Sequence, residues 1–142
     1  MSLIPANYYQ KIVGVLPILC VDLIIQNEHD EYFLIKRMNE PKKGEWWVVG
    51  GRVKKGENLE EAAIRKIKEE IGVQVRDLKP VGYFEAIYKI NPFNQKKDFH
   101  TISVVFKTRI NDQKIILDNQ SSEWKYGTEL PKDFIVKPFL SR

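Results

Sequence analysis

The chain has 142 residues, which suits one domain with a buried core, and its 43% hydrophobic and 30% charged residues are ordinary for a globular protein. The net charge of +4 is too modest to predict nucleic acid as the main partner. The sequence lacks an apolar run of the roughly 18 residues that a membrane span needs, and it lacks the pattern of a secretory signal. We therefore expect no membrane association and a cytoplasmic location.

The lysine pairs and the single cysteine each give a smaller expectation. Lysine pairs occur at residues 42–43, 54–55 and 96–97, and they are expected either to be solvated or to surround an anionic ligand. The single cysteine, Cys20, lies in an apolar run and cannot form an internal disulfide. We expect it to pack as a small hydrophobic residue.

The first half of the chain is predicted to form strands and turns. Residues 17–25 are apolar and β-branched, which predicts a buried strand. A turn at residues 27–30 leads to a second strand at 31–37, so the two strands form a hairpin. Residues 46–49 predict a short strand that ends at the glycine pair 50–51. Alternation along this strand puts one of its two tryptophans in the core, and the other could stack on a base or sugar.

The clearest helix begins after Asn58. Asn58 is a good N-cap, and Glu61 stands at the capping-box position three residues later. Gly72 is the expected C-terminal stop. Apolar residues fall on one side of this helix at helical spacing, namely Leu59, Ala62, Ala63, Ile67 and Ile71.

Strands are predicted again after this helix, at residues 73–75, 81–90 and 101–110. A short strand near Trp124 precedes a turn of helix at residues 131–135, and Trp124 and Tyr126 are expected to pack in the core. A sheet with one central helix and few others indicates an α+β layered fold.

The segment before the first strand forms a separate expectation. Residues 6–13 could form a short helix that packs on the domain or on a partner chain. We therefore predict one domain over residues 1–142, with the segment 1–15 at a possible dimer interface.

Residues 51–73 carry the chemistry. The glycine pair ends a strand and can expose backbone carbonyls, because glycine turns where side chains would clash. Glu57 lies in the following loop, and Arg65, Glu69 and Glu70 lie on the helix. Carboxylates and free carbonyls are hard oxygen ligands that suit Mg²⁺ or Mn²⁺. The simpler interpretation, a surface helix whose acids and bases pair, is weakened by the glycines and by the position of Glu57.

At these residues the sequence resembles the Nudix hydrolase family, whose signature is G-x5-E-x7-R-E-U-x-E-E-x-G-U with U aliphatic. The matching positions are Gly51, Glu57, Arg65, Ile67, Glu69, Glu70, Gly72 and Val73. One defined position departs, because Lys66 stands where the family has a glutamate that serves the metal site. The resemblance implies a Nudix αβα sandwich with a mixed central sheet and one catalytic helix, covering nearly the whole chain.

The likeness is greatest to the GDP-mannose mannosyl hydrolase branch, which releases GDP and free sugar. Residues 36–41, 44–46 and 50–53 resemble that branch, as do Asp22 and Asn27. The resemblance implies Mg²⁺ or Mn²⁺ held by Gly50, Glu70 and Gln120, with Glu69 as a further ligand and Glu57 and Arg65 in support. It also implies that Arg37, Arg52 and Asp22 bind substrate, and that Glu69, Glu70, Arg52 and Asp22 serve catalysis.

The general base is not identified by the sequence. The sugar-cleaving branch has a histidine directly after the metal-binding glutamine, whereas Gln120 is followed by Ser121, which has no useful basicity near neutrality. His100 and Glu123 are alternative candidates, and His29 is expected to be solvent-exposed in its turn.

Three functions therefore stay open. The first is a Mg²⁺-dependent hydrolase of a nucleoside diphosphate sugar such as GDP-mannose, favoured by Lys66, the arginine pattern and Gln120. The second is a conventional Nudix pyrophosphohydrolase of ADP-ribose or a related nucleotide, favoured by the retention of Glu69 and Glu70. The third is a nucleotide-binding module that has lost catalysis, favoured by Lys66 and Ser121.

Overall fold

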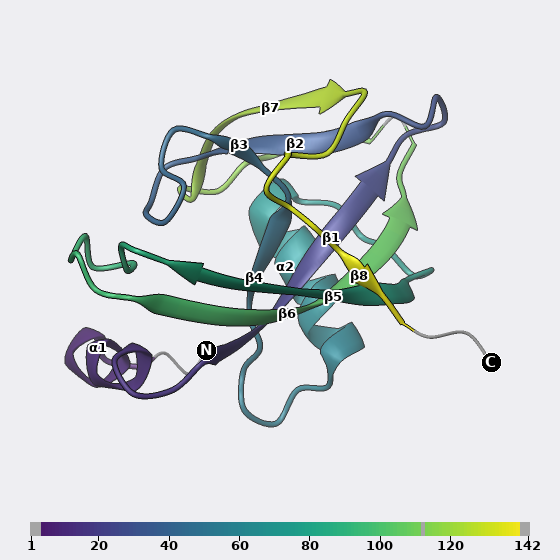
Figure 1. Cartoon of the computed structure of the whole chain (residues 1–142). Coiled ribbons are helices and arrows are strands. Elements are labelled where there is room, and N and C mark those ends of the chain that lie inside the picture. Colours follow the sequence, from purple (N-terminus) through teal and green to yellow (C-terminus); the bar gives the residue numbers. More distant parts are fainter. Residues whose placement is uncertain (1–3, 112, 140–142) are drawn as a thin grey trace.

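A mixed sheet of eight strands organises the chain, as Figure 1 shows for the computed structural model, which describes residues 4–111 and 113–139. The sheet has the order β3-β2-β1-β6-β5-β8, with β4 paired to β1 and β7 paired to β2. This mixed sheet and its two helices confirm the predicted α+β fold. Neither helix in these residues is long and apolar enough to cross a bilayer. The elements are α1 (Ala6–Val13), β1 (Ile18–Gln26), β2 (Tyr32–Arg37), β3 (Trp46–Trp47), β4 (Val49–Arg52), α2 (Leu59–Ile71), β5 (Lys79–Tyr88), β6 (Phe99–Arg109), β7 (Ser121–Gly127) and β8 (Lys137–Pro138).

Strand β1 is the centre of the sheet. It runs parallel to β6 from the pair Ile18↔Thr101 to the pair Gln26↔Arg109. On its other side it pairs antiparallel with β4, and it meets β2 only through Gln26↔Tyr32. The predicted hairpin therefore exists, but β2 leaves β1 to pair with β3 and β7. In Figure 1 these three strands diverge from the group of β5, β6 and β8, with β1 crossing between the two groups.

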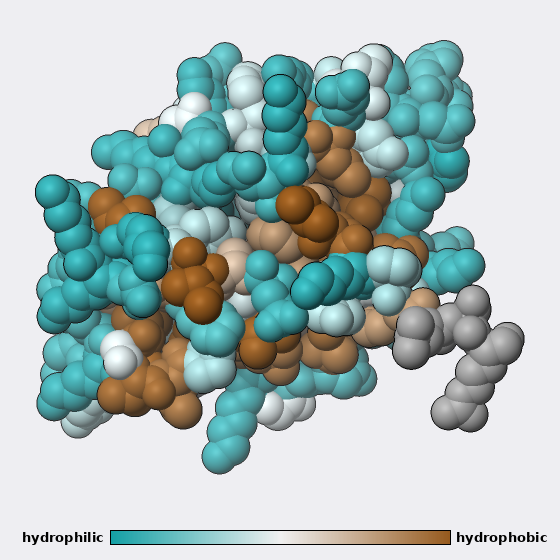
Figure 2. All heavy atoms as spheres, in the orientation of Figure 1, coloured by the Kyte–Doolittle hydropathy of each residue, from teal (hydrophilic) through white to brown (hydrophobic). Residues whose placement is uncertain are grey.

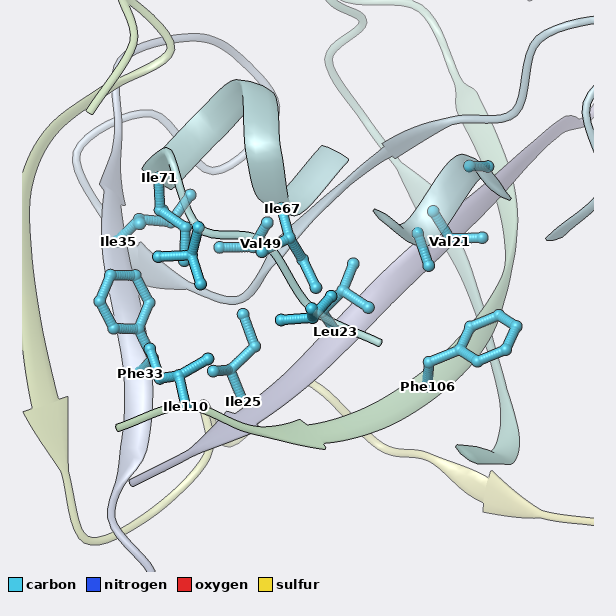
Figure 3. Close-up of a cluster of buried hydrophobic side chains, with 14 residues drawn as sticks. Val21, Leu23, Ile25, Phe33, Ile35, Val49, Ile67, Ile71, Phe106 and Ile110 are labelled. Carbon is cyan, nitrogen blue, oxygen red and sulfur yellow. The ribbon is translucent and has the colours of Figure 1, made fainter. Parts of the chain in front are cut away.

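Helix α2 forms as its sequence predicts. The side chain of Asn58 accepts a hydrogen bond from the backbone N–H of Glu61, and the Glu61 carboxylate accepts one from the backbone N–H of Asn58. Gly72 ends the helix with a φ of 73°, a left-handed conformation that glycine adopts without strain. Figure 3 shows Ile67 and Ile71 pointing from α2 into the core over β1, with Val21, Leu23 and Ile25 opposite them.

A second apolar cluster fills the space between the diverging strands. Trp47, Phe84 and Phe134 pack with ring centroids 5.1 to 6.0 Å apart. Phe134 is supplied by a hydrogen-bonded turn in which its N–H donates to the carbonyl of Pro131 at 3.0 Å. The predicted helical turn at residues 131–135 is thus an isolated hydrogen-bonded turn over residues 131–134 and does not extend into a helix.

Two local predictions are wrong. Residues 73–75 form no strand, although Val73 and Val75 are buried, because their alternate side chains join the core without pairing to a neighbouring strand. Trp124 is 42% exposed, although it stacks on the buried Phe33 from the same face of the β2–β7 pair. Tyr126 packs partly buried against the core as expected.

Alternation along β3 agrees with the prediction for the tryptophan pair. Trp47 is buried, whereas Trp46 is half-buried with the ammonium of Lys125 4.3 Å from its ring centroid. Of the two tryptophans, Trp47 lines the pocket described below.

Helix α1 occupies the predicted residues and packs at the end of the sheet through a small cluster of Val13, Ile18 and Phe99. Figure 2 shows apolar side chains gathered at the lower left, where Figure 1 places α1. Tyr8, Val15 and Leu16 are exposed in this region. The dimer interface stays a prediction.

Candidate active site

A pocket of about 360 Å³ lies where β1, β4 and α2 meet the loop after β2. Its volume falls in the range of small-ligand sites. It brings together six residues that the sequence assigned to metal or substrate: Asp22, Arg37, Gly50, Arg52, Glu70 and Gln120. Glu57, Arg65 and Glu69 lie outside its lining.

Gly50 is the point where three elements converge. It pairs with Asp22 across β1 and β4, and a Cβ on Gly50 would lie 2.1 Å from the Asp22 Oδ1, so only glycine fits. Its backbone N–H donates to Glu70 Oε2 at 3.2 Å. The glycine pair therefore lets a strand approach both carboxylates closely, which places Asp22 and Glu70 beside the same backbone.

Glu70 is the deepest carboxylate of the pocket, with 3% exposure. Burial raises the pKa of Glu70 to about 7, since the Lys66 ammonium offsets only part of that effect and Asp118 raises it further. A carboxylate buried with so little compensating charge is suited to accept a cation.

The donor set fits one divalent ion with few protein ligands. Besides Glu70, the pocket offers the backbone of Gly50 and the side-chain oxygen of Gln120, which accepts a hydrogen bond from the Asn39 amide at 2.8 Å. Residues 4–111 and 113–139 contain no cluster of three or more His, Cys, Asp or Glu that could hold a metal. Such an ion would depend on waters and substrate phosphates, as Mg²⁺ commonly does.

Asp22 is the second buried carboxylate, 8% exposed on β1. Burial raises the pKa of Asp22 to about 6, while a hydrogen bond from Ser103 and the charge of Arg37 oppose that rise. Cys20 precedes it on the same face of β1, and burial raises the pKa of its thiol to about 12. Cys20 is thus a neutral wall residue, half-buried, as the prediction of a small packing residue implies.

Two arginines, Arg37 and Arg52, line the pocket. Arg37 Nε donates to the carbonyl of Pro41 at 2.7 Å, which fixes the side chain at the start of the loop. The guanidinium of Arg52 lies 5.1 Å from the ring centroid of Tyr9, so α1 contributes to the pocket. Such groups provide forked donation to phosphate oxygens.

Glu57, Arg65 and Glu69 form a scaffold behind the pocket. Arg65 donates to both Glu57 oxygens, at 2.6 and 2.9 Å, and to Glu69 at 3.2 Å. It also donates to the backbone carbonyl of Arg52 at 3.0 Å. The hydrogen bonds from Arg65 hold the pKa of Glu57 down at about 2. These contacts fix the strand that carries Arg52, and they commit the Glu69 carboxylate to Arg65.

The candidate bases named from the sequence lie elsewhere. His29 is exposed in its turn, as expected, and His100 lies on β6 outside the pocket lining. Glu123 is exposed on β7, where it pairs with Lys36 at 3.3 Å. Ser121 is buried at 6% exposure and also lies outside the lining.

The pocket includes residues that the sequence reasoning missed. Thr101 and Ser103 on β6 line it, as do Tyr9 and Tyr88. Thr101 and Ser103 stand two residues apart on β6 and so share one face of the strand, which was a usable signal for these two. Local patterns give no such signal for Tyr9, because it reaches the pocket only through the packing of α1.

The mixed sheet, the glycine pair and the acidic helix α2 together are those of the Nudix fold. The chain belongs to the Nudix hydrolase family, because the NUDIX domain matches residues 16–132. The low-salt glycan biosynthesis protein Agl8 of Haloferax volcanii is 35% identical over 122 residues, which cover 86% of this chain and 78% of that protein.

Two further proteins resemble this chain, one in sequence and one in fold. The ADP-ribose pyrophosphatase of Methanocaldococcus jannaschii is 35% identical over 113 residues, 80% of this chain, and the chain spans only 57% of that protein. The crystal structure of a MutT protein from Methanosarcina mazei Go1 aligns with a TM-score of 0.66 and 24% identity over 80% of this chain and 79% of that one. At that identity the match supports the fold alone.

Proposed function

We propose that the chain is a hydrolase dependent on Mg²⁺ or Mn²⁺ that cleaves a nucleoside diphosphate sugar, of the GDP-mannose type, into nucleoside diphosphate and free sugar. The observation that supports this most is the composition of the pocket. Asp22, Arg37, Arg52, Gly50, Glu70 and Gln120 converge in it, and they are the residues that the resemblance to the sugar-cleaving branch assigns to substrate and metal.

Each residue has a role that its position allows. Glu70, the Gly50 carbonyl and the Gln120 side chain would hold the divalent ion, which neutralises charge on the departing diphosphate. Arg37 and Arg52 bind the diphosphate oxygens. Asp22 is the buried carboxylate left for the sugar end, where it can accept a proton from the attacking water. We leave Glu69 out of the metal set, because its carboxylate accepts hydrogen bonds from Arg65 and it lies outside the pocket lining.

The relatives support two different substrates. The name of Agl8 refers to glycan biosynthesis, which fits a sugar nucleotide, and the Methanocaldococcus relative is an ADP-ribose pyrophosphatase. Cleavage of the phosphoanhydride is therefore our second candidate. The single pocket carboxylate on α2 argues against it, since Lys66 replaces one signature glutamate and Glu69 is paired with Arg65.

Product analysis tests the proposal. The protein is incubated with GDP-mannose and, separately, ADP-ribose in Mg²⁺ and ¹⁸O-labelled water, and products are followed by ³¹P and ¹H NMR and mass spectrometry. We expect GDP and mannose from GDP-mannose, with the label in the sugar, because the C–O bond breaks. A nucleoside monophosphate and a sugar phosphate, with the label on phosphorus, would instead establish pyrophosphohydrolysis. Nucleotide binding without turnover on either substrate would favour a module that has lost catalysis.

A further inference from the structure

Lys66 is held against the glycine pair rather than extended into solvent. Its side chain is 14% exposed, and it lines the pocket from α2. A Cβ on Gly51 would lie 2.5 Å from Lys66 Cε, so the stem of the lysine lies directly on the glycine backbone. The missing side chain of Gly51 thus makes room for Lys66, which fixes the direction of its ammonium.

The carboxylates near Lys66 do not use its donors. Its Nζ lies 3.6 Å from Glu69 Oε2 and 3.7 Å from Glu70 Oε2, which is longer than the roughly 2.7–2.9 Å of a charge-assisted hydrogen bond. Within the described chain the ammonium makes no hydrogen bond. An ammonium has three donors, so Lys66 brings unused donors to the wall of the pocket.

The charges around the pocket suit an anionic ligand. Arg37, Arg52 and Lys66 line it, against the buried carboxylates Asp22 and Glu70. Lys42 lines it as well, but its ammonium is engaged by Asp133 at 2.7 Å. A diphosphate is a multiply charged group with several strong acceptors, and it matches a wall of cations with free donors.

We propose that Lys66 is a substrate-binding residue whose ammonium donates to the diphosphate of the nucleotide, beside Arg37 and Arg52. This rests on the proposed function only in taking a nucleoside diphosphate group as the ligand. At the position where the family signature has a metal-site glutamate, this chain thus has a direct phosphate contact. The purely structural role, neutralising Glu70, does not by itself require unused donors facing the pocket.

Binding in the absence of metal isolates this contact. GDP and ADP are titrated into the protein in EDTA by calorimetry, using the wild type, Lys66→Met and the matched control Lys68→Met, which removes an exposed lysine from the same helix. We expect Lys66→Met to weaken binding on the order of tenfold or more, the size of a lost hydrogen bond to a charged group, with Lys68→Met unchanged. Arg37→Ala serves as the positive control.

A second readout separates contact from scaffolding. The Lys66 Nζ signal in a ¹H–¹⁵N spectrum of the lysine ammonium groups, assigned by its loss in Lys66→Met, is expected to shift and exchange more slowly when GDP or ADP binds. A merely structural lysine would not respond in this way. If Lys66→Met does not fold, Lys66→Gln, which keeps the length and polarity, takes its place in the titration.

Either of two results would overturn the proposal. The first is a nucleotide affinity of the Lys66 variant within twofold of the wild-type value while Arg37→Ala loses affinity. The second is a Lys66 Nζ signal that does not change when the nucleotide binds. Neither depends on which bond the enzyme cuts. Product analysis can therefore refute sugar cleavage while the Lys66 contact stands, and the titration can refute the contact while sugar cleavage stands.

Discussion

Replacing Glu70 by glutamine should make the metal-free protein more stable while removing its response to metal. Glu70 is 3% exposed, and its carboxylate has one backbone donor, Gly50, at 3.2 Å. Because burial outweighs the attraction of Lys66, the pKa of Glu70 rises to about 7. The folded protein thus binds a proton at Glu70 more tightly than the unfolded chain, and the ionised form opposes folding. Glutamine imitates the protonated form and avoids that cost.

The size of the effect follows from the pKa. A rise from 4.5 to about 7 corresponds to roughly 3 kcal/mol of unfolding free energy, since one pKa unit is about 1.4 kcal/mol. The amide group that Glu70→Gln introduces needs partners of its own, which leaves an expected gain of about 1 to 3 kcal/mol. The stability gained by Glu70→Gln depends on pH. The contribution of Glu70 to wild-type stability falls as pH rises from about 4.5 to about 7, and the variant lacks this contribution. Both proteins keep the similar contribution of Asp22, whose pKa is raised to about 6.

Urea denaturation in EDTA at pH 5 and pH 8, repeated in Mg²⁺, measures both effects. Mg²⁺ should stabilise the wild type and Glu69→Gln, because a ligand that binds only the folded state adds to its stability, but not Glu70→Gln. Glu69→Gln is the matched control, because it makes the same change at the neighbouring residue of α2. If Glu70→Gln is less stable than wild type at pH 8 in EDTA, then burial of the ionised Glu70 carboxylate does not destabilise the metal-free protein, and the reasoning is refuted. Equal Mg²⁺ stabilisation of Glu70→Gln and wild type would remove Glu70 from the metal site.

Two further predictions concern the residues that hold the pocket together. Glu57→Gln should cost on the order of 1.5–3 kcal/mol at pH 7, because it weakens the paired hydrogen bonds from Arg65. The stability from Glu57 should be lost as pH falls from about 4.5 to about 2, so urea curves of wild type and variant should converge at low pH. Gly50→Ala should lower the unfolding free energy on the order of 1–3 kcal/mol and abolish activity, since its Cβ would overlap Asp22. Gly14→Ala, which meets no atom closer than 3.4 Å, is its control, and equal thermal stability of the two variants would contradict the packing argument.

Features that depend on contacts between residues close in sequence were predicted best, and features that depend on contacts between distant residues were predicted worst. Helix α2 was predictable in extent, cap and buried side, because the interactions that define a helix act between residues three and four apart. The glycine pair and the convergence of Arg37, Arg52 and Asp22 were also indicated, through resemblance to a family. At residues 131–135 only the turn was predictable, whereas the burial of Phe134 beside Trp47 and Phe84 depends on strands far away in the sequence.

By itself, the sequence determined the α+β class, the helix that carries the acids, and six of the residues that line the pocket. Only the tertiary structure decided how the adjacent Glu69 and Glu70 divide their roles, with one paired to Arg65 and the other buried against Gly50. It also decided that Lys66 lies along Gly51 into the pocket and that Tyr9 reaches Arg52 from α1. The physical reason is that neighbouring residues on a helix differ by about 100° in direction, so what each meets depends on strands brought there by distant parts of the chain.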